Sequence, residues 1–131
     1  MACDLRVVLP NRPGALVSAC EAVAAAGINV DAICGDLRPG ETWGYLHLLV
    51  DDGTGARKVL EEAGFEVTSD HHVDIVEIED RPGELVKAFR KFSERGENLE
   101  VVYLAGDTRV VIGSENMRPD MPGVKMTDAK Y

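Results

Sequence analysis

The sequence predicts an α+β protein built from two copies of one β-α-β-β-α-β unit, of which the second copy is incomplete. Two repeated segments carry this prediction. Residues 11–16 read NRPGAL and residues 80–85 read DRPGEL, an offset of 69 positions. Residues 27–30 (GINV) and 96–99 (GENL) recur at the same offset of 69. Two different segments that recur in phase indicate an internal duplication.

The first unit begins with a strand and a helix. Residues 5–9 alternate as a strand does, and residues 10–14 end that strand. Pro13 is expected as the first helical residue, where its missing N–H costs nothing. Apolar side chains, with Cys20 among the small core residues, then recur at helical spacing until Gly27 stops the helix.

The rest of the first unit reads as a hairpin, a helix and a last strand. Residues 28–37 and 42–50 are the two strands of the hairpin. Residues 51–54 supply capping residues for a short helix, which is expected to turn Ala56, Val59, Leu60 and Ala63 inward. Residues 65–68 extend again. This order is that of the split β-α-β, or ferredoxin-like, unit, with an antiparallel sheet and both helices on one face.

The second unit repeats the first half of this pattern. Residues 73–78 form its first strand, a helix with an inner stripe of Leu85, Ala88, Phe89 and Phe92 follows, and a hairpin spans residues 98–112. Pro119, Pro122 and Gly123 then forbid a regular helix. We therefore expect modules at 1–71 and 72–131, with an irregular tail over 117–131 and a short edge strand at 124–126.

Composition excludes several classes of function. A net charge of −9 opposes a nucleic-acid phosphate backbone. No segment has the apolar length of a membrane span, and the start of the chain lacks the apolar core of a signal peptide, so a cytoplasmic location is the default. Three cysteines are an odd number without close pairing, which argues against a disulfide framework.

One strand predicts a partner. In residues 42–50, Trp43, Tyr45, His47 and Leu49 share one side, and neither side of the strand is plainly polar. Helices cover only one face of a ferredoxin-like sheet, so the other face packs on the second module or on another chain. We therefore expect a homodimer.

The repeated motifs resemble those of the ACT domain. Both copies carry Asn/Asp-Arg-Pro-Gly-x-Leu after the first strand and Gly-x-Asn at the start of the second strand. The resemblance spans residues 4 to about 113 and implies a stand-alone tandem regulatory protein, not an enzyme. ACT domains bind amino acids or similar small ligands, usually between two domains. No cofactor and no metal are expected.

The resemblance also implies site residues. In members that bind an amino acid, the residues matching Asn11 and Asn29 hydrogen-bond the polar head of the ligand, and Asp80 and Asn98 match them in the second copy. Some members carry a histidine where this chain has Leu9 and Ile78, which removes one polar contact. The candidate ligand-binding residues are Asn11, Arg12, Pro13, Gly14, Ala15, Leu16, Ile28, Asn29, Asp80, Arg81, Pro82, Gly83, Glu84, Leu85, Asn98 and Leu99.

The chemistry of the turn supports this interpretation. The first N–H groups of a helix lack partners and carry partial positive charge, so the corner at Gly14 can receive a carboxylate. Asn11 offers both a donor and an acceptor, and Asn29 on the neighbouring strand can add hydrogen bonds to the ammonium or carboxylate group of the ligand. Ionised Asp80 cannot donate, so the second corner favours an ammonium group. The simpler interpretation is that both corners only shape a turn.

Other residues are expected to be structural. Asp70, His71 and His72 invite a metal site, but neighbouring strand residues point to opposite faces, so we expect both histidines at the linker or surface. Asp4 and Asp74 open their strands and are expected to be exposed. Two alternative functions remain open: an acylphosphatase-like hydrolase that uses Arg12 or Arg81, and an assembly module that binds no ligand.

Overall fold

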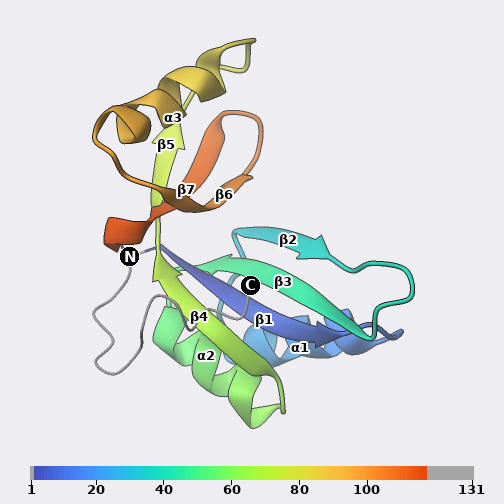
Figure 1. The fold of residues 1–131 in the computed structure, drawn as a ribbon. Coiled ribbons are helices and arrows are strands. Elements are labelled where there is room, and N and C mark those ends of the chain that lie inside the picture. Colours follow the sequence, from blue (N-terminus) through green and yellow to red (C-terminus); the bar gives the residue numbers. More distant parts are fainter. Residues whose placement is uncertain (1, 118–131) are drawn as a thin grey trace.

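Two antiparallel sheets follow one another along the chain (Figure 1). The computed structural model describes residues 2–117. The elements in chain order are β1 (Cys3–Pro10), α1 (Ala15–Ala25), β2 (Ala32–Asp36), β3 (Trp43–Val50), α2 (Gly53–Glu62), β4 (Glu66–His72), β5 (Asp74–Glu77), α3 (Glu84–Glu94), β6 (Leu99–Leu104), β7 (Arg109–Ser114) and the 3-10 helix η1 (Glu115–Met117).

The first sheet has the predicted β-α-β-β-α-β architecture. Its strand order is β2-β3-β1-β4, and every neighbouring pair is antiparallel. Helices α1 and α2 cover one face (Figure 1). Alternation along β1 directs Leu5, Val7 and Leu9 toward these helices, where they are at most 1% exposed. This core confirms the pattern read from the sequence.

The second sheet contains three strands in the order β5-β7-β6, with α3 on its outer face. Phe92 of α3 packs on Val110 and Ile112 of β7. Within residues 74–117 the structure contains no counterpart of α2 or of a fourth strand. The second unit is therefore incomplete over this range, as the sequence predicts, and the expected edge strand at 124–126 lies outside the described residues.

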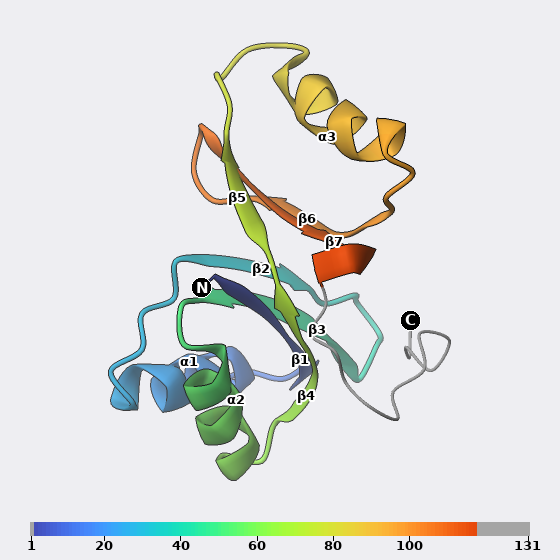
Figure 2. The ribbon, with the colours of Figure 1, turned by 90° about the vertical axis from the view of Figure 1, so that its left-hand side faces the viewer.

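The second sheet stands over the open face of the first. Strand β4 leads directly into β5, and the layers follow the order of α1 with α2, first sheet, second sheet and α3 (Figure 2). Leu49 of the first sheet packs in one cluster with Val73, Ala105 and Val111. The second unit thus covers one end of the open face, while Trp43 at the other end remains 48% exposed.

The structure corrects several expectations about the elements. Helix α1 begins at Ala15 and not at Pro13, because Gly14 has φ 88° and is left-handed. Strand β2 begins at Ala32, so the range expected from residue 28 was too long. Helix α2 buries Ala56 and Leu60 while Ala63, its C-cap, is exposed.

Two further side chains lie nearer to solvent than predicted. Leu85, in the first turn of α3, is 37% exposed, whereas Ala88 and Phe92 of the same helix are buried. Cys20 is only partly buried, whereas its neighbour Ala19 is fully buried. Among residues 2–117, no helix has the length and apolar character that crossing a bilayer requires.

Candidate functional site

The two repeated corners have the same backbone geometry. Gly14 and Gly83 have φ 88° and 89°, a conformation that L side chains rarely adopt. The first helical hydrogen bond then forms from the Ser18 amide to the Gly14 carbonyl in one corner, at 2.9 Å, and from Lys87 to Gly83 in the other, at 3.2 Å. The glycine in each motif is therefore required by the turn itself.

Asn11 is engaged with the loop between β2 and β3. Its side-chain Nδ2 donates to the carbonyl oxygens of Arg38 at 3.2 Å and of Glu41 at 2.9 Å. Both amide hydrogens are thus used, so the expectation that Asn11 offers a ligand a donor does not hold in this conformation. Its Oδ1 oxygen can accept from an ammonium group, since the structure gives that atom no partner among residues 2–117.

The second corner is surrounded by acidic groups. Arg81 pairs with Glu79 at 2.6 Å and with Glu84 at 2.8 Å, as expected of a surface arginine. Hydrogen bonds from Arg81 and from Lys87 hold the pKa of Glu84 below its ordinary value. A free carboxylate would meet Asp80 and Glu84 here, so the corner suits an ammonium group better than an anion.

Asn11 and Asn29 lie at opposite ends of the first sheet. Asn11 follows Pro10, and its backbone N–H donates to the Thr42 carbonyl at 2.9 Å. Asn29 precedes β2 near the end where Cys3 pairs with Val50, and its side chain donates to Asp31 at 2.7 Å. Strand β1 has 8 residues, and a strand of that length spans roughly 25 Å. One small ligand cannot contact both asparagines of one unit. The expectation that Asn11 and Asn29 of the same unit hydrogen-bond one ligand therefore does not hold.

Asn98 and Leu99 line an open hollow of about 430 Å³ between the end of α3 and the start of β6. The other residues of this hollow are Phe89, Ser93, Gly96 and Glu97. No residue of the Asp80 corner contributes to it. In the first unit, Ile28 is half-buried against the core, and Leu16 beside the corner is 43% exposed.

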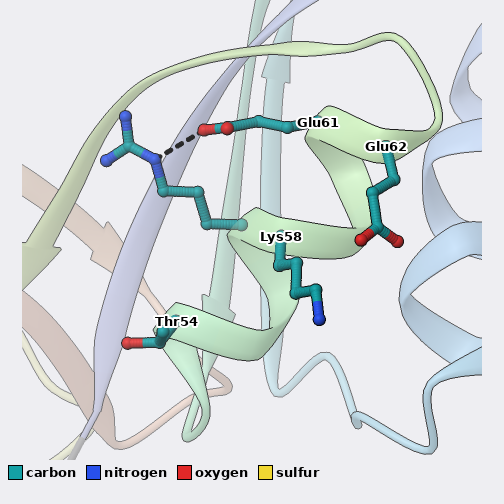
Figure 3. Close-up of a pocket in the computed structure, with 5 residues that line it drawn as sticks. Thr54, Lys58, Glu61 and Glu62 are labelled. Atoms are coloured by element: carbon teal, nitrogen blue, oxygen red, sulfur yellow. Dashed lines mark hydrogen bonds and ion pairs between the residues drawn. The ribbon is translucent and has the colours of Figure 1, made fainter.

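A second hollow, of about 470 Å³, lies along the outer face of α2 and contains no candidate residue (Figure 3). Its walls are Thr54, Arg57, Lys58, Glu61 and Glu62. Arg57 is held by Glu61 at 2.7 Å, and this bond is the main cause that raises the pKa of Arg57. We interpret this hollow as a solvated helix face.

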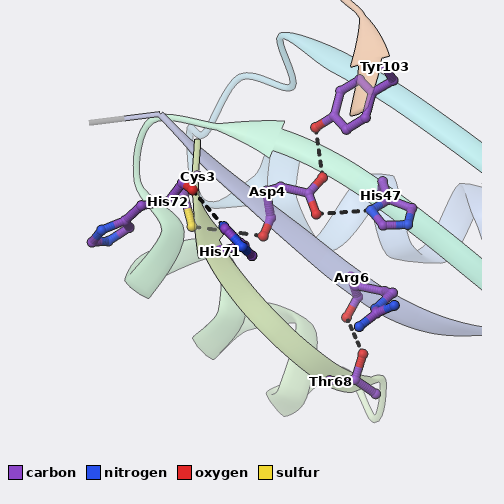
Figure 4. Close-up of polar contacts among 8 residues, drawn as sticks. All are labelled: Cys3, Asp4, Arg6, His47, Thr68, His71, His72 and Tyr103. Carbon is purple, nitrogen blue, oxygen red and sulfur yellow. Dashed lines mark hydrogen bonds and ion pairs between the residues drawn. The ribbon is translucent and has the colours of Figure 1, made fainter. Parts of the chain in front are cut away.

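Asp4 was expected to be exposed, and that expectation is wrong. Its side chain is 0% exposed and lies between His47 Nδ1 at 2.9 Å and the Tyr103 hydroxyl at 2.7 Å (Figure 4). Burial and the Asp4 charge raise the pKa of Tyr103, so the phenol stays a neutral donor. The alternation of β1 places Asp4 on the face opposite Leu5, but no local signal showed that β6 covers that face.

His71 was expected at the linker or surface. It lies at the end of β4 that leads into β5, but it is buried, at 5% exposure, while His72 is exposed. Its Nδ1 lies 2.6 Å from the His72 carbonyl oxygen and its Nε2 lies 3.4 Å from Glu100 Oε1. Strand β4 therefore contributes a second polar contact to the second sheet. Sequence reasoning missed it because Glu100 belongs to a strand distant in the chain.

The fold is similar to solved structures. No model of a known protein family and no curated protein sequence matches the chain. A protein from Bacteroides thetaiotaomicron shares 30% identity with a TM-score of 0.73, over 88% of this chain and 80% of that one. The regulatory subunit of aspartate kinase from Thermus thermophilus shares 22% identity with a TM-score of 0.64, over 86% and 82% of the two chains. The corresponding subunit from Thermus flavus gives 21% and 0.66 over the same shares, 86% and 82%.

Proposed function

Since the chain belongs to the ACT-domain family, we propose that it is a regulatory protein whose units bind an amino acid or a related small carboxylate where one unit meets another. The observation that carries this proposal is the duplicated corner. Gly14 and Gly83 hold two turns in one conformation, at φ 88° and 89°, each in front of a helix start. At the first corner the helix start attracts a carboxylate, and Asn11 Oδ1 can accept from an ammonium group.

The separation of Asn11 from Asn29 supports a site shared between units. A ligand at the Gly14 corner is roughly 25 Å from the Asn29 end of the same strand. Both asparagines can reach one ligand only if the corner of one unit lies beside the strand start of another. We propose that a homodimer provides this arrangement. The modules 1–71 and 72–131 are the units of each chain that meet those of the other.

The exposed end of the first sheet supports such a dimer. Trp43 is 48% exposed and its ring contacts Tyr45 edge to face, with 5.2 Å between the ring centroids. Aromatic side chains of this kind are enriched where proteins associate. We further propose that the protein acts in the cytoplasm as a regulator without catalysis. The two similar structures from Thermus are regulatory subunits of aspartate kinase, which supports the regulatory part of this proposal.

Calorimetric titration against each common amino acid tests the proposal. Wild type should bind at least one of them, and a ligand at about 100 times its dissociation constant should add ~2.7 kcal/mol to the free energy of unfolding. Asn11→Ala and Asn29→Ala should each weaken binding and leave the fold intact. Asn116→Ala is the matched control, since Asn116 is exposed and lies outside the candidate residues.

The outcomes separate the alternatives. Loss of binding in both variants but not in the control supports a shared site. Absence of any response at millimolar amino acid contradicts the proposal and leaves the assembly module as the better interpretation. Release of phosphate from an acyl phosphate, abolished by Arg12→Ala, would favour the hydrolase instead.

A further inference from the structure

The loop between β2 and β3, residues 37–42, runs back beside the end of β1, where Asn11 fastens it to the first corner (Figure 1). The Asn11 side-chain Nδ2 donates to the carbonyl oxygens of Arg38 at 3.2 Å and of Glu41 at 2.9 Å. Its backbone N–H donates to the Thr42 carbonyl oxygen at 2.9 Å, which extends the pairing of β1 with β3. One residue of the corner therefore makes three hydrogen bonds to this loop.

The two carbonyl groups that accept from the Asn11 side chain belong to the first and last residues of a tight turn. The Glu41 N–H donates to the Arg38 carbonyl oxygen at 3.1 Å, and Gly40 has φ 84°. Proline in the second position and a left-handed glycine in the third are typical of a type II turn, and Pro39 and Gly40 take these positions here. The Asn11 amide thus spans the base of the turn and holds both of its ends.

The same amide hydrogens are the donors that a ligand carboxylate needs. An asparagine side chain has two N–H hydrogens and one carbonyl oxygen. While the loop accepts from both hydrogens, Asn11 presents only Oδ1 to a ligand, and an oxygen suits an ammonium group. Once the loop moves away, the side chain presents both kinds of group to a zwitterion. The two states of the loop therefore differ in their affinity for an amino acid, which is the condition for a ligand to shift a conformational equilibrium.

The contacts that hold the loop are of a kind that can open. Asn11 and every residue from 37 to 42 are exposed. Water can therefore replace both carbonyl partners of the Asn11 amide, and the net cost of each exchange is small. Because the loop contributes no buried side chain, its opening leaves the core of the first unit intact.

The second corner lacks the chemistry for this contact. Asp80 stands where the first unit has Asn11, and an ionised carboxylate cannot donate to a carbonyl oxygen. The hairpin loop of the second unit, residues 105–108, is also shorter than the loop at residues 37–42. A corner side chain that donates to its own hairpin loop is therefore a property of the first unit.

We propose that the contact between Asn11 and the β2–β3 loop is an autoinhibitory latch: while the loop is held, Asn11 offers no donor to a ligand, and an amino acid that binds at the first corner releases the loop. The latch rests on the proposed function for the identity of its ligand, whereas the holding of the loop needs no ligand. The apparent affinity is reduced by the fraction of molecules whose loop is open. A change that opens the loop and leaves Asn11 in place should therefore raise the affinity.

Gly40→Ala opens the loop without altering Asn11. An added Cβ would have nothing within 4 Å, and φ is 84°, so the substitution strains only the backbone of the turn. Calorimetric titration of the intact protein with each common amino acid should give several-fold tighter binding in Gly40→Ala than in wild type. Gly106→Ala is the matched control, because Gly106 lies in the β6–β7 turn with φ 94° and equally open surroundings. Its affinity should equal that of wild type.

The outcomes separate the latch from the proposed function. Wild-type binding that Gly40→Ala leaves unchanged or weakens overturns the latch alone, and so does equal tightening in Gly106→Ala. Binding that is detected only in Gly40→Ala supports both the latch and the proposed function. If neither wild type nor Gly40→Ala binds any common amino acid at millimolar concentration, both are overturned.

A measurement without ligand tests the holding of the loop and does not depend on whether Gly40→Ala folds. Asn11→Asp keeps the size of the side chain, removes both donors and places a charge against two carbonyl oxygens. Nitrogen relaxation NMR should give order parameters of about 0.85 for the Gly40 and Glu41 amides in wild type and below about 0.6 in Asn11→Asp. Asn29→Asp makes the same chemical change at the opposite end of β1 and should leave both values as in wild type. Values that are unchanged in Asn11→Asp, or already low in wild type, overturn the latch.

Discussion

Removal of the Tyr103 hydroxyl is the sharpest test of how the two sheets are joined. In Tyr103→Phe the ring stays, with its tilted contact to His47 at 6.1 Å between centroids, and only the donor to Asp4 is lost. The Asp4 side chain is 0% exposed, so water cannot easily supply a replacement. A hydrogen bond to a charged group contributes about 1.5–3 kcal/mol, and leaving a buried charge short of a donor favours the upper half of that range.

We therefore expect Tyr103→Phe to lower the free energy of unfolding by roughly 2–3 kcal/mol. In a chain of 131 residues, this corresponds to a fall in melting temperature of roughly 6–12 °C. Urea denaturation measures the loss. A double-mutant cycle with Asp4→Ala separates the pair from its surroundings, because Asp4→Ala should cost at least about 1 kcal/mol less when position 103 is already Phe.

This prediction is wrong if the free energy of unfolding of Tyr103→Phe lies within about 0.5 kcal/mol of the wild-type value, which is the ordinary range for a surface substitution. It also fails if the two losses simply add, since additivity means that the hydroxyl and the carboxylate do not interact. Either result would mean that the Tyr103–Asp4 hydrogen bond contributes little to holding the second sheet, which then depends on the apolar cluster around Leu49 and on the contact of His71 with Glu100.

Four other predictions concern individual residues. Gly14→Ala should destabilise by about 1–2 kcal/mol in thermal unfolding, because φ is 88° with nothing within 4 Å of an added Cβ, so backbone strain is the whole cost; a neutral result would contradict the left-handed turn. Asp52→Ala should cost about 1 kcal/mol by loss of the α2 cap to the Gly55 N–H at 2.9 Å, while Asp51→Ala should cost little. Thiol labelling at pH 8 should modify exposed Cys34 quickly and Cys3 only after unfolding. Burial raises the pKa of Cys3 from 9.0 to about 12. The protonated Cys3 thiol therefore contributes to the free energy of unfolding below pH 9, and this contribution is lost as the pH rises toward 12. A free energy of unfolding that does not change between pH 9 and 12 would contradict the raised pKa.

Most of the fold could be predicted because its signals are local. The alternation of Leu5, Val7 and Leu9 and the glycines that end the helices are visible within a few residues of each element. The duplication is visible as short segments that recur 69 residues apart. The errors also have local causes. Pro13 is a good first helical residue in general, but the left-handed Gly14 after it delays the start of α1.

The candidate site was less accessible to sequence reasoning. The resemblance identified Asn11 and Asn29, but only the strand register shows that they stand at opposite ends of β1. Nor did any motif indicate that loop carbonyls of Arg38 and Glu41 engage the Asn11 amide. These contacts depend on the length and path of the hairpin loop, which short-range patterns do not specify.

The sequence by itself determined the duplication, the order of strands and helices and the residues that share each strand face, because periodicity and glycine and proline positions act on neighbouring residues. The tertiary structure alone decided what covers those faces. Tyr103 meets Asp4 across 99 positions of the chain, and the same packing of sheet on sheet buries His71. Side-chain alternation says that two residues face the same way, but the free energy of burying a charge is settled only by the groups that arrive from elsewhere.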